Sequence, residues 1–478
     1  MTISNLHEEN GVKHYDLIVL GSGSGNTLIG PEWDDKHVAL IDGGIFGGTC
    51  LNVGCIPTKM FVYPATLAAK AQEASELGVD MQVNTVNWAS IRERVFDNRI
   101  DKISAGGRDW RASLPNVDFY PEYAHFTGTH SVETASGVRM QAPQIVIATG
   151  SRAVRPEVPG INLPQVLTND TIMRLEELPQ RVVVLGGGVI AAEFSHVFAS
   201  LGSQVTQINR SHTLLRGVDH EIVDRFVQAA SKRWQMLLGY HPIEIIENDD
   251  KSVTVVTEHE GQRVETTADV VLVATGRKPN SDSLHAGEFF DLNLNGTIHV
   301  DSYQRVLSGG EVVPGVFALG DVSSTYQLKH VANHEARTVQ HNLSHPEDLR
   351  ASDHRFVPGA VFTHPQIAFV GINEHAAREM GEREGFEVVT KVQNYGDTAY
   401  GWAMEDSVGA VKLVARKDTG QLLGAAIVGE EASVLIQPLI QAMSFNLGVR
   451  DMARGQYWIH PALTEVVENA LLGLDVDA

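Results

Sequence analysis

Two widely separated stretches of the chain repeat one pattern, in which a short apolar run leads into a glycine-rich turn and a second apolar run follows. The apolar runs are residues 15–21 and 37–42 in the first copy, and residues 181–186 and 204–209 in the second. We expect each run to be a strand and each intervening segment to be helical, which makes a βαβ unit. Two βαβ units with short glycine turns predict parallel α/β sheets of the Rossmann kind.

The length of the chain sets the number of domains. At 478 residues it is long enough for about three domains of ordinary size. We predict a first nucleotide-binding domain over residues 14–152, a second over 153–278, a return to the first over 279–349 and a C-terminal domain over 350–478. The last part is predicted to be α+β, with a helix in residues 432–446.

Charge and cysteine content exclude several classes of protein. Lys and Arg number 37 against 59 Asp and Glu, which gives a net charge of −22 and argues against binding to nucleic acid or to anionic membranes. The two cysteines exclude a secreted disulfide scaffold. The polar N-terminus lacks the apolar core of a signal peptide, and no apolar run is long enough to span a membrane. We therefore expect a cytoplasmic protein.

The first glycine turn predicts a dinucleotide site. Gly21 and Gly23 permit a tight turn and a close approach of a pyrophosphate to a helix N-terminus, and Ser24 and Gly25 follow them. Asp42 ends the next strand, where a carboxylate accepts hydrogen bonds from ribose hydroxyls. The third glycine of the usual pattern is replaced by asparagine, and a Gly-Pro pair should cut the crossover helix short. A plain glycine turn without a ligand is the alternative.

The second glycine turn also begins a nucleotide site, and its surroundings favour NADPH. Gly186, Gly188, Val189 and Ile190 belong to a GxGxxA sequence, but no acidic residue stands at positions 207–209. Arginines follow instead, at positions 210 and 216. A carboxylate would repel a 2′-phosphate, whereas the guanidinium groups of Arg210 and Arg216 would bind it. The alternative is that both arginines are solvated surface residues.

The segment GGTCLNVGCIPTK at residues 47–59 is the strongest chemical signal. Its thiols, Cys50 and Cys55, are five positions apart with Gly54 between them, so they reach each other only across a distorted turn. A bond formed there would be reducible, which suits a catalytic pair. A structural or zinc-binding pair is the alternative, but zinc would need two further ligands.

Two further groups of residues point to the same site. His460 precedes Glu465 near the C-terminus, and a carboxylate beside an imidazole fixes its tautomer and raises its basicity. The alternative is a surface histidine at a helix start. Gly320 and Asp321 end another strand, and the helix expected from Lys329 and His330 onward could direct its N-terminus at an electron-rich ring. Ordinary helix capping explains that second group equally well.

These residues together resemble the flavoprotein pyridine nucleotide-disulfide oxidoreductases of class I. The resemblance covers nearly the whole chain and rests on the cysteine segment and the terminal His-Pro…Glu sequence. It implies FAD in the first nucleotide site and NADPH in the second. It also implies that Cys50 attacks the substrate disulfide, that Cys55 faces the flavin as a thiolate, and that Lys59 lies near the flavin and may pair with Glu193.

The resemblance adds a partner and completes the set of site residues. His460 would protonate the departing thiolate and Glu465 would orient it, and in this family the pair comes from the second chain of an obligate homodimer. No metal ion is implied. The remaining residues expected to contact a cofactor are Gly48, Thr49, Thr149 and Gly150 for FAD, together with Gly320, Asp321, Lys329 and His330, and Gly276 for NADPH.

The substrate is expected to be mycothiol disulfide, with three alternatives. Residues 59–63, 330–337, 395–406 and 453–461 resemble the subgroup that reduces this disulfide. Lys59 is the one basic residue between positions 57 and 67, which suits an uncharged sugar-inositol substrate better than the carboxylates of glutathione disulfide. The alternatives are a dihydrolipoamide dehydrogenase, another reductase of small disulfides, and a non-catalytic redox sensor. Tyr63, Tyr395 and Trp402 are possible wall residues of the pocket.

Overall fold

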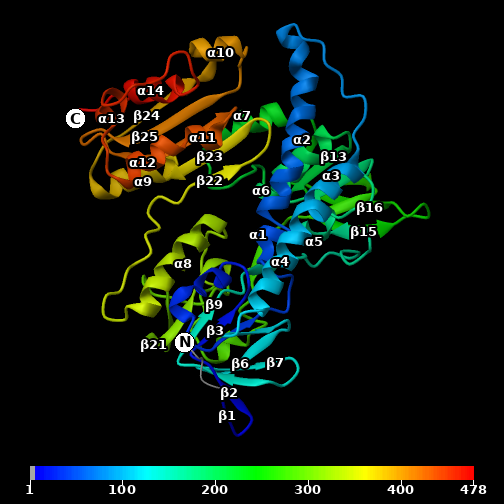
Figure 1. The fold of residues 1–478 in the computed structure, drawn as a ribbon. Helices are drawn as coiled ribbons and strands as arrows, with labels where there is room; N and C mark the ends of the chain where they lie inside the picture. The colour runs from blue at the N-terminus through cyan, green and yellow to red at the C-terminus, as the bar shows by residue number, and fades with distance from the viewer. Residues whose placement is uncertain (1–5, 478) are drawn as a thin grey trace. The chain divides into compact units, whose positions relative to one another are not determined.

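The computed structural model describes residues 6–477, which form two compact units (Figure 1). The first unit contains residues 6–58, 90–154 and 276–354, and the second contains residues 59–89, 155–275 and 355–477. The chain therefore changes unit close to the predicted boundaries at 152, 278 and 349. Residues 59–89 cluster with the second unit rather than with the rest of residues 14–152.

A six-stranded sheet forms the core of the first unit. Its strand order is β20-β21-β9-β3-β4-β5, and every pair is parallel except β20 with β21. Alternate side chains bury both faces: Ile18 and Leu20 belong to one apolar cluster, and Leu17 and Val19 to the other. The strands are β3 (Leu17–Leu20), β4 (Val38–Ile41), β5 (Val117–Tyr120), β9 (Gln144–Ile147), β20 (Arg305–Ser308) and β21 (Glu311–Ala318).

A smaller sheet and several helices complete the first unit. The smaller sheet is built from β1 (His7–Glu9), β2 (Val12–His14), β6 (Ala124–Gly128), β7 (Ser131–Thr134) and β8 (Arg139–Gln141). A two-stranded ribbon pairs β10 (Ser151–Ala153) with β19 (Arg277–Pro279). The α-helices that lie wholly in this unit are α1 (Gly48–Asn52), α4 (Asp101–Ala112) and α8 (Lys329–Ser344). Helices α2 (Cys55–Glu73) and α3 (Trp88–Val95) cross its boundaries in the sequence.

The second unit begins with a parallel sheet of order β11-β18-β12-β13-β14. Its strands are β11 (Val166–Leu167), β12 (Arg181–Leu185), β13 (Gln204–Asn209), β14 (Gln235–Leu238) and β18 (Val270–Val273). The helices between them are α5 (Asn169–Ile172), α6 (Val189–Ser200) and α7 (His220–Ala230), and an antiparallel sheet contains β15 (His241–Glu247), β16 (Val253–His259) and β17 (Gln262–Ala268).

An antiparallel sheet of order β22-β23-β26-β25-β24 forms the C-terminal part of the second unit. The strands are β22 (Gly359–Val361), β23 (Gln366–Gly371), β24 (Val388–Asn394), β25 (Ala410–Arg416) and β26 (Leu422–Gly429). The helices are α9 (Glu374–Glu384), α10 (Ala399–Ala403), α11 (Ala432–Leu435), α12 (Gln437–Ser444), α13 (Val449–Arg454) and α14 (Glu465–Leu472). Side chains of α11 to α14 share one apolar cluster with the sheet.

The structure confirms the predicted fold class, with two Rossmann-like sheets and an α+β C-terminal part. One local prediction is confirmed and one was wrong. The Gly-Pro pair cuts the first crossover short, so that it contains only 3-10 turns, at Gly25–Leu28 and Pro31–Trp33, because Pro31 lacks the N–H that an α-helix would need there. The helix expected at 432–446 is split after Leu435, because Pro438 likewise cannot donate to the preceding turn.

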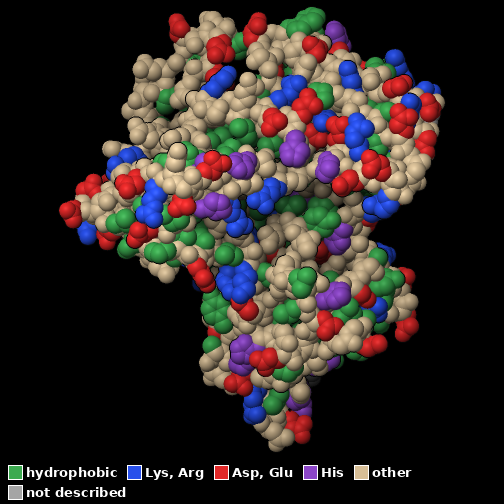
Figure 2. All heavy atoms as spheres, turned by 180° about the vertical axis from the view of Figure 1, so that it is seen from behind, with side chains coloured by type: hydrophobic (Ala, Val, Ile, Leu, Met, Phe, Trp, Pro, Cys, Tyr) green, Lys and Arg blue, Asp and Glu red, His purple; other side chains and the backbone are tan. Residues whose placement is uncertain are grey.

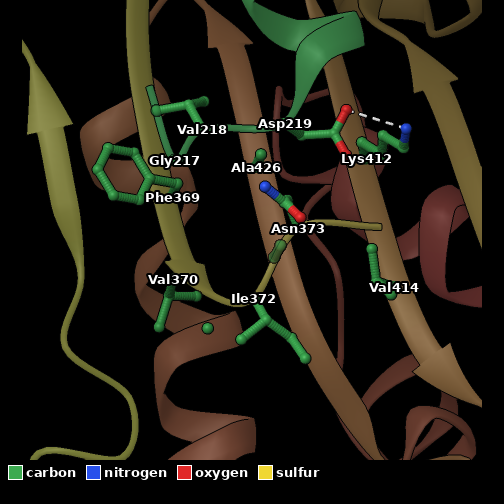
Figure 3. A pocket seen from close by; sticks show the side chains of 12 residues that line it. Gly217, Val218, Asp219, Phe369, Val370, Ile372, Asn373, Lys412, Val414 and Ala426 are labelled. Atoms are coloured by element: carbon green, nitrogen blue, oxygen red, sulfur yellow. Dashed lines mark ion pairs between the residues drawn. The ribbon is translucent and has the colours of Figure 1, made fainter. Parts of the chain in front are cut away.

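A shallow pocket within the second unit lies beside the C-terminal sheet (Figure 3). Lys412 is almost fully buried on its floor, where its Nζ lies 2.9 Å from Asp219 and 2.7 Å from Glu374. Burial alone would lower the pKa of Lys412, but hydrogen bonds to the two carboxylates raise it above its ordinary value. The two charged residues that line the pocket, Lys412 and Asp219, are therefore paired with each other, and the pocket contains none of the predicted site residues.

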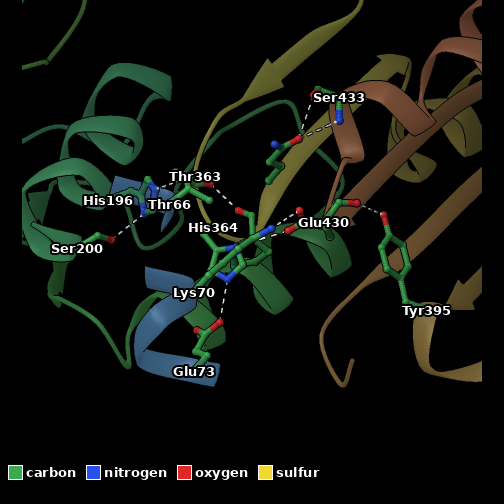
Figure 4. Close-up of polar contacts among 12 residues, drawn as sticks. Thr66, Lys70, Glu73, His196, Ser200, Thr363, His364, Tyr395, Glu430 and Ser433 are labelled. Carbon is green, nitrogen blue, oxygen red and sulfur yellow. Dashed lines mark hydrogen bonds and ion pairs between the residues drawn. The ribbon is translucent and has the colours of Figure 1, made fainter. Parts of the chain in front are cut away.

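A polar network of the second unit connects helix α2 to the C-terminal part (Figure 4). Glu73 lies 2.8 Å from the Nε2 of His364 and also binds Arg233, while Lys70 lies 2.5 Å from Glu430. Burial tends to raise the pKa of Glu73, but the bond and charge of His364 and the charge of Arg233 prevail and lower it to about 2. The Glu73 carboxylate is therefore ionised at neutral pH, and its bonds fix the far end of α2 within this unit.

The surface carries both signs of charge without a strongly basic patch on the face drawn in Figure 2. Acidic and basic side chains are interspersed over that face. None of the helices formed by residues 6–477 combines the length and the apolar character needed to span a bilayer.

Candidate active site

The first glycine turn has the geometry of a phosphate-binding cradle. Gly21 has a φ of +107°, and a Cβ there would lie 2.3 Å from the carbonyl oxygen of Ala148. Gly23 and Gly48 approach so closely that a Cβ on Gly48 would lie 2.8 Å from the Cα of Gly23. A side chain on Gly48 would clash with the backbone of Gly23, so this close approach requires glycine. Without a side chain at that position, the turn stays open for a ligand. Gly25 packs equally tightly, since its Cβ would lie 2.9 Å from Val19.

Asp42 is hydrogen-bonded to the first glycine turn. Its carboxylate accepts hydrogen bonds from the backbone N–H of Ser22 at 2.7 Å and of Gly44 at 2.8 Å. The Ser22 hydroxyl also donates to it at 2.5 Å. The carboxylate is therefore held at the carboxyl end of β4, where a ribose is expected. Ser22 had not been predicted, although a hydroxyl between two turn glycines is a signal for such a bond.

The second half of the first unit supplies more polar groups. Lys329, the first residue of α8, donates from Nζ to the Ser24 hydroxyl at 2.7 Å. The Ser151 hydroxyl donates to Asp321 at 2.6 Å, and the fully buried Glu335 accepts from the N–H of Gly320 at 2.7 Å. Glu335 was missed because nothing local to it in the sequence predicts a bond to a residue 15 positions earlier.

The remaining expected FAD residues lie in the same unit. Thr149 and Gly150 follow β9, and their carbonyls accept from Asn280 at 2.8 and 3.0 Å. The Thr149 hydroxyl is buried and has no hydrogen-bond partner among residues 6–477. The glycine cradle, the held carboxylate and this unsatisfied hydroxyl fit a bound dinucleotide such as FAD. Thr49 and His330 lie on α1 and α8.

The buried Arg111 binds Asn26, the residue that stands where the usual pattern has a third glycine. Its Nε donates to the side-chain oxygen of Asn26 at 2.8 Å, and its Nη2 donates to the Asn26 carbonyl at 2.9 Å. Another bond reaches the carbonyl of Ile29. Asn26 is therefore satisfied by a guanidinium, and the turn keeps its shape without a crossover α-helix. Sequence reasoning missed Arg111 because it lies 85 positions away.

The two cysteines lie next to each other where two helices meet. Cys50 is on α1 and Cys55 begins α2, and the break at Val53 and Gly54 turns the chain between them. A Cβ on Gly54 would lie 2.9 Å from the Thr49 carbonyl oxygen, so this turn requires glycine. Neither cysteine is part of a disulfide in this structure, and Cys50 is half-buried while Cys55 is exposed.

The surroundings of Cys50 disfavour its thiolate form. The hydrogen bond with Cys55 and then burial raise the pKa of Cys50 far above its ordinary value, while the positive charge of Lys329 opposes this. Two thiols this close share their protons and do not ionise together. Cys50 therefore needs a nearby base before it becomes a nucleophile.

Lys59 and the buried Glu193 form an ion pair in the second unit. Lys59, one turn after Cys55 along α2, donates from Nζ to both carboxylate oxygens at 2.7 Å, and the N–H of Phe362 donates to the same carboxylate at 2.9 Å. Glu193 is buried, and burial raises its pKa above the usual value although Lys59 opposes the shift. The pairing suggested from the sequence is therefore present.

The second glycine turn repeats the geometry of the first. Gly186 has a φ of +135°, and a Cβ there would lie 2.2 Å from the carbonyl oxygen of Ala274. Gly188 precedes α6, no side chain caps that helix, and a Cβ on Gly188 would meet nothing within 4 Å. The N-terminus of α6, which begins with Val189 and Ile190, is thus open to a phosphate.

The end of β13 carries amides where an NADH site would have a carboxylate. Gln207 is fully buried and donates to the Gly186 carbonyl at 3.0 Å, and Asn209 donates to two loop carbonyls. Arg210 and Arg216 are exposed, and neither guanidinium has an ion-pair partner among residues 6–477. These residues fit NADPH. Gly276, expected at the same site, clusters with the first unit, where its carbonyl accepts from Val154.

His460 and Glu465 form the expected dyad in the C-terminal part. The Nδ1 of His460 lies 2.7 Å from a carboxylate oxygen of Glu465, while the imidazole is 72% exposed. Glu465 begins α14 and is mostly buried, and its carboxylate fixes the ring at the Nδ1 side. The exposed ring is therefore accessible to a group from outside the chain.

Comparison with known proteins shows the family of this chain. A family model described as "Pyridine nucleotide-disulphide oxidoreductase" matches residues 15–336, and the dimerisation-domain model of the same family matches residues 357–471. The chain belongs to the pyridine nucleotide-disulphide oxidoreductase family. This confirms the family resemblance inferred from the cysteine segment and the His-Pro…Glu sequence.

Three members of the family show how far the likeness extends. Mycothione reductase of Mycobacterium tuberculosis is 48% identical over 469 residues, which cover 96% of this chain and 99% of that protein. Dihydrolipoyl dehydrogenase of Synechocystis is 31% identical and covers 95% and 98% of the two chains. The structure of the HOCl-induced flavoprotein disulfide reductase RclA from Escherichia coli has a TM-score of 0.82 at 26% identity, covering 96% of this chain and 100% of that one.

Proposed function

We propose that this chain is an FAD-containing reductase that uses NADPH to reduce mycothiol disulfide to mycothiol. The observation that carries the proposal is the 48% identity, end to end, with a mycothione reductase, against 31% with a dihydrolipoyl dehydrogenase. The amides at the end of β13 and the unpaired arginines after it support NADPH as the reductant. A dehydrogenase that uses NAD would be expected to carry a carboxylate there.

The first unit would hold the flavin cofactor. The backbone N–H groups at Gly21, Gly23 and Gly48 would bind the pyrophosphate. Asp42 would hold a ribose, and Asp321 would bind a hydroxyl of the ribityl chain. FAD, when bound, supplies the two-electron link between NADPH and the cysteine pair. Gly186, Gly188 and the start of α6 would bind the pyrophosphate of NADPH, with Arg210 and Arg216 on its 2′-phosphate.

The cysteine pair would carry out the exchange with substrate. In the reduced pair, the Cys50 thiolate attacks one sulfur of the substrate disulfide, forms a mixed disulfide and expels one mycothiol thiolate. Cys55, as a thiolate, then attacks the sulfur of Cys50, expels the second mycothiol and leaves the Cys50–Cys55 disulfide. Each turnover consumes NADPH and one proton and releases two thiols. Lys59, held by Glu193, would place a positive charge beside the flavin.

His460 would act as the acid and base of this exchange. Its Nε2 would take the proton from Cys50 before attack and give it to the departing mycothiol thiolate, with Glu465 stabilising the charged ring. The raised pKa of Cys50 explains why such a base is needed. We propose that the imidazole comes from a second chain, because its ring is exposed and the C-terminal part matches a dimerisation domain.

This proposal assigns a function to each part of the chain. Residues 14–152 and 279–349 would bind FAD, 153–278 NADPH, and 350–478 a second copy of the chain. Among the possible pocket residues, Tyr63 and Trp402 are exposed and stay candidates for stacking on the sugar and inositol groups. Tyr395 is not a candidate, because its ring is fully buried and its hydroxyl donates to the carbonyl of Glu430.

The test is a comparison of two activities in one variant. We expect Cys50→Ser to abolish NADPH-dependent release of mycothiol from its disulfide while NADPH-to-quinone electron transfer continues, because the quinone takes electrons before the thiol step. His460→Ala should lower only the disulfide activity as well. Equal loss of both activities in Cys50→Ser would contradict the order of steps, and wild-type enzyme that releases no mycothiol would contradict the proposed function.

A further inference from the structure

A group of metal-ligating side chains lies on the hairpin β1–β2, which contains no residue of the proposed site. His7 and Glu9 are on one strand and His14 is on the other. One ligand atom from each lies within 4.8 Å of the other two. In residues 6–477 this is the one group of three such side chains that comes so close together.

The register of the hairpin places these three side chains on one face. His7 and His14 are directly paired across the two strands, and Glu9 follows His7 by two positions, so all three point the same way. The connecting residues Asn10 and Gly11 both have positive φ, of 53° and 71°, as a two-residue hairpin turn requires. The face is therefore set by the backbone.

The hairpin is anchored to the rest of the first unit (Figure 1). Strand β2 pairs in parallel with β8, so the hairpin forms the edge of the smaller sheet. Lys13, which points to the opposite face, donates to the Tyr120 hydroxyl at 3.0 Å, and Arg139 donates to the Asn10 carbonyl at the turn. These two cations therefore have bonds elsewhere, and they hold the hairpin in place.

We propose that His7, Glu9 and His14 bind a borderline divalent cation of the zinc class. Two imidazoles and one carboxylate are a ligand set that Zn²⁺ accepts, and three protein ligands leave a position for water. Around a tetrahedral zinc the ligand atoms lie about 3.4 Å apart, given metal–ligand distances near 2.1 Å. The Nε2 of His7 is already 3.7 Å from the Glu9 carboxylate, and the two imidazole rings have centroids 5.1 Å apart.

Because the group is exposed, its ligand atoms can move to the shorter distances that zinc requires. His7 and Glu9 expose 67% and 65% of their side chains, so their rotamers adjust without moving the core. The net charge of −22 also favours the uptake of cations. A cation bound there would cross-link the two strands of the hairpin and stabilise the edge of the sheet.

The test is zinc binding by the tag-free holoenzyme, with its cysteines oxidised to the disulfide so that they offer no thiolate. Equilibrium dialysis against Zn²⁺ should show one tightly held ion per chain. We expect His7→Ala with His14→Ala to weaken this binding at least tenfold, and Glu9→Gln to weaken it less. Because the hairpin is exposed, these variants should retain full disulfide reductase activity.

A second histidine pair provides a matched control. His125 and His285 have ring centroids 5.0 Å apart, and Glu288 lies 3.8 Å from His285, so the residue types and spacing are similar. His125→Ala with His285→Ala should leave zinc binding unchanged. Equal binding by wild type and the His7–His14 variant, or no uptake of zinc by wild type, would overturn the proposal.

Discussion

Removal of Lys59 should destabilise the protein because it leaves the buried carboxylate of Glu193 without its ion-pair partner. Lys59→Met keeps most of the side-chain volume but deprives the carboxylate of Glu193 of its two 2.7 Å hydrogen bonds. Glu193 is only 4% exposed, and the N–H of Phe362 alone would remain to satisfy it. An uncompensated charge of this kind costs about 3 kcal/mol or more.

The cost should depend on pH with a definite sign. Without Lys59, burial raises the folded-state pKa of Glu193 further above its unfolded value. A group with a raised folded pKa favours the folded state below the unfolded pKa and loses that effect as pH rises through the folded value. The penalty of Lys59→Met should therefore be largest at pH 8 and should shrink towards pH 5, where Glu193 takes up a proton.

The assay is thermal unfolding of wild type and variant at equal cofactor content, followed across this pH range. A loss of about 3 kcal/mol in a unit of this size corresponds to a fall in Tm of about 3 to 5 °C. Lys70→Met is the matched control, because it removes a half-exposed ion pair from the same helix and should cost about 1 kcal/mol or less. An equal, pH-independent fall in both variants would refute the reasoning.

The remaining predictions concern the coenzyme, acid stability and the flavin. Arg210→Ala with Arg216→Ala should raise KM for NADPH at least tenfold with little effect on NADH, and an unchanged coenzyme ratio in steady-state kinetics would disprove this. Glu73→Gln should cost about 1 kcal/mol at pH 7, since the group is half-exposed. Because the pKa of Glu73 is lowered, that cost should vanish as pH falls from about 5 towards 2, whereas exposed Glu76→Gln should show no such trend in denaturant titrations. Gly21→Ala should lower the flavin absorbance per chain, and normal flavin content would show that the cradle tolerates a side chain.

The parts of the site that the sequence predicted are those that depend on neighbours in the chain. The turns at Gly21 and Gly186 need positive φ, which glycine supplies, and the pair Cys50 and Cys55 is close because a short segment folds back at Gly54. The bond between His460 and Glu465 spans five positions. Such geometry follows from local backbone rules.

The parts that the sequence did not predict depend on packing between distant segments. Arg111 and Glu335 are buried charges that satisfy turn groups far away in the sequence, and only the folded chain brings them there. Tyr395 looked like a possible pocket residue because it is aromatic in a predicted site segment, yet it packs in the core. The clustering of residues 59–89 with the second unit likewise results from long-range contacts.

The most direct test of the proposed function is the rate of NADPH oxidation by the purified, flavin-loaded protein with three disulfides. Mycothiol disulfide, glutathione disulfide and lipoamide would be offered separately, and kcat/KM compared. We predict that mycothiol disulfide is preferred by at least tenfold over either of the others. A preference for lipoamide, with NADH replacing NADPH, would contradict the proposal and favour a dihydrolipoamide dehydrogenase.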